Sequence, residues 1–132
     1  MEDIFARIVF GHLVGDYLLQ NKSMALKKSE KGFNSIFWCT LHCLIYTTSM
    51  CLFLRTLNPL VIFSIFITHW LIDRWSLASK WLKLIRGRNF LEAYLSGNEI
   101  DVAFSCLVYA VVDNTIHLLP IWFVVNISQS VL

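Results

Sequence analysis

Histidine and aspartate recur in this sequence at a spacing of four residues. The pairs are His12 with Asp16, His69 with Asp73, and Asp113 with His117. Residues four apart on an α-helix lie one turn apart on the same face, so each pair predicts one polar stripe with an imidazole and a carboxylate. Both groups bind divalent metal ions and carry protons. His42, the fourth histidine, has no aspartate at this spacing.

The segments that carry these residues are too apolar for a water-soluble domain. Of the 132 residues, 57% are hydrophobic and 15% are charged, whereas soluble domains have about 25% charged residues. Spanning a bilayer takes about 20 residues of helix, because every backbone polar group must be satisfied within the segment. We therefore expect an all-α, integral membrane four-helix bundle, one domain over residues 1–132, with helices at about 4–20, 36–54, 60–77 and 102–125.

The charges predict how this bundle is oriented. Eight basic residues lie in the two long connections, at about 21–35 and 78–101; they are Lys22, Lys27, Lys28, Lys31, Lys80, Lys83, Arg86 and Arg88. The positive-inside rule places both connections in the cytoplasm and both termini on the non-cytoplasmic side. Residues 76–85 fit either an amphipathic helix along the headgroups or a solvated basic loop. The net charge of +2 argues against nucleic acid as a partner and leaves membrane lipids as the expected surroundings.

Aspartates within a bilayer need compensation, because each costs about 2.5–3.5 kcal/mol at mid-helix. Hydrogen bonds between helices, a proton or ion pathway, and a metal centre are three ways to supply it. We favour the metal centre, because a cation neutralises carboxylates that hydrocarbon would otherwise force to take up protons. The expected cofactor is a divalent metal, zinc above all, as one ion or two, on these ligands: His12, Asp16, His42, His69, Asp73, Asp113 and His117.

Other residues are expected to support this site. Gln20, Tyr46 and Asn114 are candidates for hydrogen bonds to the ligands. Gly11 and Gly15 would let another helix approach closely. A rise of 1.5 Å per residue places most of the ligands in one layer, but Asp16 and His117 join it only if the last helix starts beyond the membrane surface or is tilted.

The sequence also contains four cysteines, a residue type that can bind metals. Cys39, Cys43, Cys51 and Cys106 lie inside apolar runs, so we interpret them as buried free thiols outside the metal site. Bis-histidine haem is disfavoured, because the aspartates would place negative charge beside an apolar macrocycle.

The chemistry that such a centre would support is hydrolysis. A bound metal lowers the pKa of a water ligand to about 7, and Asp16, Asp73 or Asp113 is the candidate base. A lipid-linked phosphoester or amide fits a site within the bilayer, and Lys22, Lys80 or Arg86 could bind an anionic head group. The alternative is a subunit that transports protons, ions or small solutes along the same residues. Oligomer formation stays open.

Four motifs resemble a family of small bacterial integral membrane proteins, the domain of unknown function 3307. They are the runs 11–20 (GHLVGDYLLQ), 41–42 (LH), 68–73 (THWLID) and 113–117 (DNTIH). The family has a glutamine where this chain has Asn114, and often a lysine where it has Ser76. The resemblance implies the bacterial inner membrane and a membrane-embedded His/Asp constellation, but no reaction. A looser resemblance links the chain to inner-membrane metal-dependent hydrolases.

Overall fold

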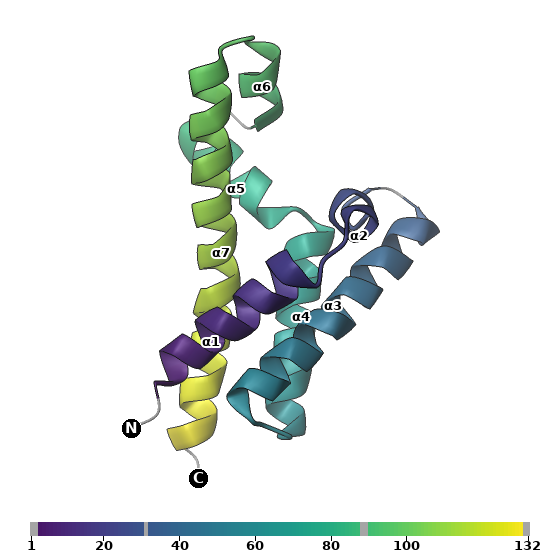
Figure 1. The fold of residues 1–132 in the computed structure, drawn as a ribbon, viewed down its shortest axis with the longest axis vertical. Coiled ribbons are helices and arrows are strands. Elements are labelled where there is room, and N and C mark those ends of the chain that lie inside the picture. Colours follow the sequence, from purple (N-terminus) through teal and green to yellow (C-terminus); the bar gives the residue numbers. More distant parts are fainter. Residues whose placement is uncertain (1–2, 31, 88–89, 131–132) are drawn as a thin grey trace.

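The computed structural model describes residues 3–30, 32–87 and 90–130, and all regular structure in these ranges is helical. Figure 1 shows the elements in chain order. They are α1 (Ile4–Leu13), the π-helix η1 (Val14–Leu18), α2 (Lys22–Lys27), α3 (Phe33–Leu54), α4 (Pro59–Arg74), α5 (Leu77–Arg86), α6 (Phe90–Leu95) and α7 (Glu99–Ser130). The all-α prediction is confirmed.

Two helices, α3 and α7, are long and apolar enough to cross a membrane. A third span results if α4 and α5, which meet at a bend of 56°, are counted together. The first expected span, residues 4–20, contains the 10 residues of α1 and the 5 of η1, and it leaves the helical structure after Leu18. By length and composition, the described residues therefore provide two or three membrane spans, fewer than the four expected.

Some helix ends differ from those predicted from hydropathy. A local turn ends one helix early, and another helix extends into a polar segment. The helix expected over 60–77 ends at Arg74, because Trp75 and Ser76 turn the chain and Ser76 has a left-handed backbone with φ 48°. The last helix begins at Glu99 and not near residue 102. The two expected loops contain α2, α5 and α6, so the segment 76–85 is largely helical.

The turn between α3 and α4 forms as its residues predict. Arg55 adopts the left-handed conformation that ends α3. The Asn58 side chain accepts a hydrogen bond from the Leu60 N–H, and Pro59 occupies the first turn of α4. Asparagine is a favoured N-cap and proline is favoured at the first helical position, so this sequence starts a helix directly after the turn.

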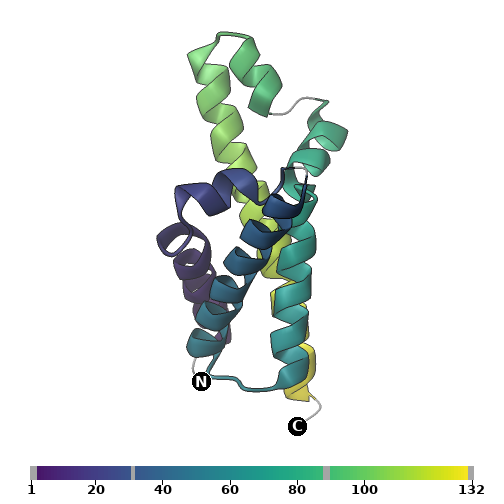
Figure 2. The same cartoon turned by 90° about the vertical axis from the view of Figure 1, so that its right-hand side faces the viewer.

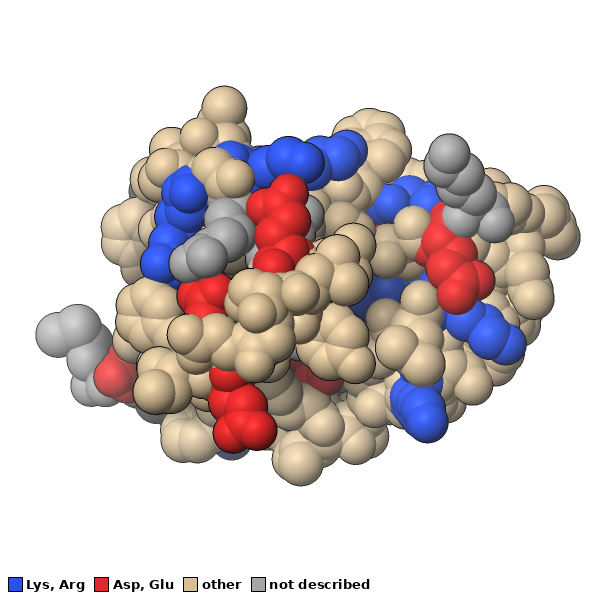
Figure 3. Space-filling model, turned by 90° about the horizontal axis from the view of Figure 1, so that it is seen from above, with Lys and Arg blue, Asp and Glu red and all other residues tan. Residues whose placement is uncertain are grey.

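Four long segments surround the centre of the molecule, since α1 packs on α3, α3 on α4, α4 on α7, and α7 on α1. Figures 1 and 2 show that both termini and the α3–α4 turn lie at one end, while α2, α5 and α6 lie at the other. We call these the terminal end and the α2 end. Figure 3 looks onto the α2 end, where Lys and Arg side chains are spread among acidic ones.

An apolar layer fills the centre toward the terminal end. Its buried members are Ile8, Tyr46, Met50, Val61, Ile65, Ile121 and Val125. Ile8, Tyr46, Ile65 and Ile121 each lie four residues, one helical turn, from a histidine on the same helix. The polar residues therefore occupy the next layer toward the α2 end.

Candidate metal centre

All four histidines are buried in the layer beside the apolar one, with at most 1% of each side chain exposed. They come from α1, α3, α4 and α7, one from each helix. The rings of His69 and His117 have centroids 4.2 Å apart, and those of His42 and His69 lie 5.0 Å apart. The packing of the four segments thus gathers imidazoles that are far apart in the sequence.

The three pairs spaced by four residues are within ion-pair distance. His12 Nδ1 lies 3.3 Å from Asp16 Oδ2, and His69 Nε2 lies 3.3 Å from Asp73 Oδ2. His117 Nε2 lies 3.9 Å from Asp113 Oδ1. In each pair the aspartate lies one turn nearer the α2 end than its histidine, so a layer of carboxylates follows the layer of imidazoles.

The tightest group of potential ligands consists of His42, His69 and Asp73, all buried. His42 Nε2 lies 3.0 Å from His69 Nε2 and 3.2 Å from Asp73 Oδ2, and the third side of the triangle is 3.3 Å. A tetrahedral zinc with ligands at about 2.0–2.1 Å has ligand separations of about 3.3–3.4 Å. Three atoms of the types that zinc binds therefore have nearly the spacing of one face of its coordination tetrahedron.

The nitrogen and oxygen atoms of this group have too few hydrogen atoms for all of their close contacts to be hydrogen bonds. Besides His69 and Asp73, the Nε2 atom of His42 contacts Gln20 Nε2 at 3.0 Å and Asp16 Oδ1 at 3.1 Å. A ring nitrogen carries either one hydrogen or one lone pair, so it cannot serve four neighbours. Asp16 Oδ1 and Asp73 Oδ2 are buried without a hydrogen-bond partner in the described part of the chain. A cation between these atoms would satisfy them together.

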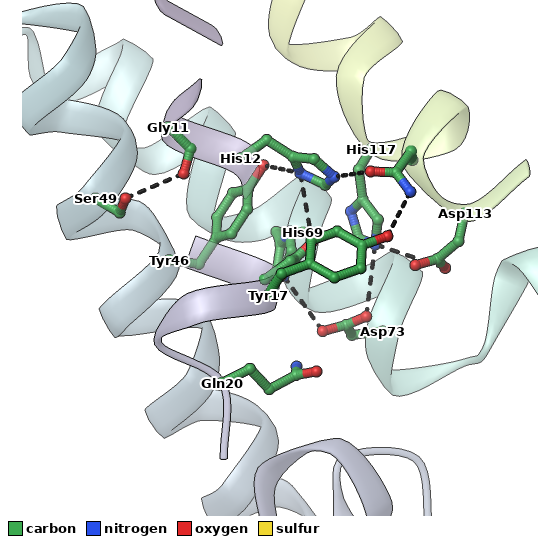
Figure 4. Close-up of polar contacts among 12 residues, drawn as sticks. Gly11, His12, Tyr17, Gln20, Tyr46, Ser49, His69, Asp73, Asp113 and His117 are labelled. Carbon is green, nitrogen blue, oxygen red and sulfur yellow. Dashed lines mark hydrogen bonds and ion pairs between the residues drawn. The ribbon is translucent and has the colours of Figure 1, made fainter. Parts of the chain in front are cut away.

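A second potential group overlaps the first. It consists of Asp16, His69 and His117, whose ligand atoms lie within 4.8 Å of one another. His69 belongs to both groups. Of the seven residues predicted as ligands, His12 and Asp113 fall in neither group found among the described residues, although both border the cluster (Figure 4).

The three residues predicted to support the ligands contact them. Tyr46 has its hydroxyl 2.9 Å from His12 Nδ1, and its ring stacks on His69 with centroids 3.6 Å apart. The Asn114 amide oxygen accepts at 2.7 Å from His12 Nε2 when that nitrogen carries the proton. Gln20 contacts His42, as described above. His12 is thereby held by side chains from α3 and α7 and lies beside the potential metal groups, not within them.

The π-helix η1 aims Asp16 toward the centre. Single π-helical turns are rare and often mark functional sites, because they shift side chains relative to a regular helix. Asp16 lies in this turn and reaches His42 on α3 and His69 on α4. Gly15, just before it, leaves no room for a side chain, since a Cβ there would lie 2.7 Å from Tyr46 Cδ2 and 3.3 Å from Tyr46 Cα. The predicted close approach of another helix at Gly11 and Gly15 is therefore made by α3.

Simple depth arithmetic left His117 too far from the other ligands, and the course of α7 explains how it joins them. The helix starts at Glu99, and its first turns together with α6 project beyond the ends of the other helices (Figure 1). Because α7 begins beyond the ends of the other helices, its His117 lies at the level of His12 and His69, with ring centroids 5.7 and 4.2 Å away. The helices also cross one another instead of running parallel, as Figures 1 and 2 show.

Lys28 is a contact that the sequence did not reveal. Its Nζ lies 2.8 Å from Asp73 Oδ1, and its side chain is 18% exposed. Burial alone would lower the pKa of Lys28, but the negative charge of Asp73 outweighs it and raises the pKa above its usual value. Lysines 22, 27 and 28 look alike in the sequence, and only the fold distinguishes the one that reaches the cluster. Tyr17 was also missed; its hydroxyl lies 2.6 Å from Asn114 Nδ2.

The cysteines are free, as predicted, but they are not all buried. Cys39 and Cys43 are buried, Cys51 is intermediate and Cys106 is exposed. The prediction was wrong for Cys106 because an apolar run in a membrane helix can face lipid and need not face protein. No cysteine belongs to a potential metal group among the described residues.

Fold and site together define a class: an all-α protein with membrane-length helices and a buried His/Asp cluster. The chain matches the family model described as "Protein of unknown function (DUF3307)" over residues 4–132 and therefore belongs to that family. Searches of curated proteins and of solved structures found no significant match. The resemblance to metal-dependent hydrolases has no support from these comparisons.

Proposed function

We propose that this chain is a multi-pass protein of the bacterial inner membrane that binds a divalent metal ion, zinc above all, through His42, His69 and Asp73. The observation that carries this proposal is the triangle of two imidazole nitrogens and one carboxylate oxygen with sides of 3.0, 3.2 and 3.3 Å. It is buried, and its carboxylate oxygen lacks a hydrogen-bond partner in the described structure. Charged side chains that are buried in proteins are either paired with an opposite charge or bound to a metal ion.

The proposed topology has four spans, with the α2 end in the cytoplasm. The basic residues of α2 and α5 support this orientation, because they lie at the same end of the molecule. In this topology four segments cross the bilayer: the longer helices α3 and α7, the helix α4, and α1 together with η1. The polar cluster then lies within the membrane and is covered toward the terminal end by the apolar layer.

One ion is favoured over two. Both potential groups need His69, and a neutral imidazole has a single lone pair for a metal. Two ions at once would require the imidazole to lose its remaining proton and bridge them. Asp16 and His117 are then alternative or additional ligands of the same ion.

The proposed reaction is hydrolysis of a lipid-linked phosphoester or amide. A divalent ion at this site would lower the pKa of a bound water to about 7. Asp113 is the best candidate base, because it belongs to neither metal group, lies beside His117 and is the most exposed of the three aspartates, at 23%. Lys80 on the exposed side of α5 is available for an anionic head group.

Metal analysis of the purified protein tests this proposal. In detergent, after incubation with zinc and removal of free metal, the wild type should retain about one zinc per chain. His42→Ala and His69→Ala should retain none. His12→Asn is the matched control, since His12 is equally buried but belongs to neither group. A folded wild-type protein that holds no zinc, or equal retention in all four proteins, would exclude the metal site.

A conduit for protons or ions is the second candidate, and one observation favours it. Polar contacts continue from the cluster through His12 and Asn114 to the Tyr17 hydroxyl, and Tyr17 is 54% exposed. Such a chain of polar side chains is typical of intramembrane relays. Flux into proteoliposomes that stops in Asp73→Asn, from a protein without bound metal, would support the conduit over the metal centre.

A further inference from the structure

Lys28 forms an ion pair with one of the two carboxylate oxygens of Asp73. Its ammonium group lies 2.8 Å from Oδ1, and His117 Nε2 lies 3.5 Å from the same oxygen. The other oxygen, Oδ2, points at the Nε2 atoms of His42 and His69. The two oxygens therefore have separate partners.

The backbone around Lys28 is fixed, so the lysine is held at this place. Met24, one turn earlier on α2, is buried. The Ser35 hydroxyl donates to the Glu30 carbonyl oxygen at 2.7 Å, and Arg74 Nη1 donates to the same oxygen at 2.8 Å. Arg74 directly follows Asp73, so α4 is bound to this connection at two consecutive residues.

An ammonium group on one oxygen of a carboxylate uses a lone pair and negative charge of that oxygen, so it favours binding of a metal ion through the other oxygen. Zinc in a four-coordinate site needs one oxygen from each carboxylate. Larger or harder ions, such as Mn²⁺, take more ligands and gain from carboxylates that bind through both oxygens. The contact between Lys28 and Asp73 thus bears on which ion fits.

We propose that Lys28 is a positioning residue that keeps Asp73 monodentate and thereby selects a four-coordinate ion, such as zinc, over ions that require more oxygen ligands. This inference rests on the proposed metal site and adds the choice of metal to it. Lys28 acts through Asp73 and does not touch the ion.

The test compares the full-length wild type in detergent with three variants. Lys28→Met removes both the charge and the hydrogen bond, whereas Lys28→Gln retains a donor without the charge. Lys22→Met removes the same charge from an exposed position at the start of α2, the helix that Lys28 follows as its C-cap. Each protein is titrated with Zn²⁺ and Mn²⁺ in competition, and its Co²⁺ form is examined by visible absorption, which is intense for four-coordinate cobalt and weak for six-coordinate cobalt.

Lys28→Met should lower the preference for Zn²⁺ over Mn²⁺ by at least about tenfold, the lower end of the effect of residues that orient ligands. Its Co²⁺ absorption should weaken. Lys22→Met should match the wild type, and Lys28→Gln should retain most of the preference because its amide can still hold Oδ1.

An unchanged Zn²⁺/Mn²⁺ preference and Co²⁺ spectrum in Lys28→Met would overturn the inference, even if both affinities changed in parallel. If Lys28→Met does not fold, Lys28→Ala takes its place, because it also removes both the charge and the hydrogen bond. The same two results then decide: an unchanged preference and spectrum overturn the inference, and six-coordinate cobalt supports it. A wild type that binds none of the three ions contradicts the proposed metal site itself, a result distinct from the loss of selectivity alone.

Discussion

The four central helices bury two layers of contrasting chemistry, one turn apart. The apolar layer contains Ile8, Tyr46, Ile65 and Ile121, and the polar layer contains His12, His42, His69 and His117. Both layers are less than 2% exposed at these positions. The apolar layer is complete, because its aliphatic side chains need only one another and the Tyr46 hydroxyl is paired with His12 Nδ1 at 2.9 Å. The polar layer leaves nitrogen and oxygen atoms unsatisfied among the described residues.

This difference indicates which layer holds the helices together and which layer is maintained for another purpose. Packed apolar side chains stabilise helix contacts in a membrane through close van der Waals contact. Buried histidines and aspartates cost free energy unless they are paired or bound to an ion. A single turn of helix thus separates a layer that stabilises the protein by packing from one that, under the proposed function, a metal ion would stabilise.

The largest expected effect is that of zinc on the polar layer. At a zinc concentration about 1,000 times the Kd, binding should raise the unfolding free energy of the wild type by about 4 kcal/mol. His69→Ala removes a ligand common to both groups and should abolish this increase. Unfolding in detergent, after chelation and again with zinc, measures both. An equal zinc effect in wild type and variant would mean that the ion binds elsewhere.

Ile65→Ala should damage the apolar layer without affecting metal binding. Ile65 is fully buried one turn from His69, and the resulting cavity should cost about 3 kcal/mol of unfolding free energy. The loss should be the same with and without zinc, measured by the same unfolding assay. Leu60→Ala, at a position that is 76% exposed on the same helix, is the control and should cost far less. A loss of zinc binding in Ile65→Ala would show that the layers are not independent.

Gly15→Ala tests the contact that joins both layers. The new methyl group would meet Tyr46 at its Cα and its ring, and that ring is stacked on His69. Overpacking of this kind should cost about 2 kcal/mol and should also weaken zinc binding, because Asp16 is the next residue. At Gly11 the nearest atom is the flexible Met50 Sδ at 2.8 Å, so Gly11→Ala should cost less. Calorimetric zinc titration and unfolding measure the two effects; the reverse order would contradict this account.

The gathering of polar residues was predictable from the sequence because helical periodicity acts over short distances. A spacing of four residues places His69 and Asp73 on one face of a helix, and an apolar composition forces such faces to turn toward one another. Nothing more was needed to predict that three separate pairs would meet. The members of the triangle were not predictable, because whether His12 or His42 joins it depends on how the helices cross.

The parts that could not be predicted are those set by turns and helix ends. Hydropathy marks the length of an apolar run, whereas α7 continues through the polar start of its sequence at Glu99. The bend after Arg74 depends on Ser76 adopting a left-handed backbone, which no simple preference of serine predicts. Lys28 reaches Asp73 because the connection that follows α2 is bound to the end of α4, a tertiary contact that residue type does not encode.

The smallest expected effect is the most direct test of what the polar layer contributes without metal. In the double variant His69→Leu with Asp73→Leu, both members of one pair become apolar, so no carboxylate is left without its imidazole. Asp16 retains His42 at 3.1 Å, and Lys28 can extend its ammonium group to water. Replacing a buried charged pair by apolar residues of similar size is often neutral or stabilising. The unfolding free energy of the metal-free double variant should therefore be within about 1 kcal/mol of that of the metal-free wild type, and the double variant should bind no zinc.

His69→Leu alone should be less stable than the double variant, because it leaves the Asp73 carboxylate buried. A double variant much less stable than the metal-free wild type would mean that the polar layer holds the helices together on its own, and that its burial needs no ion.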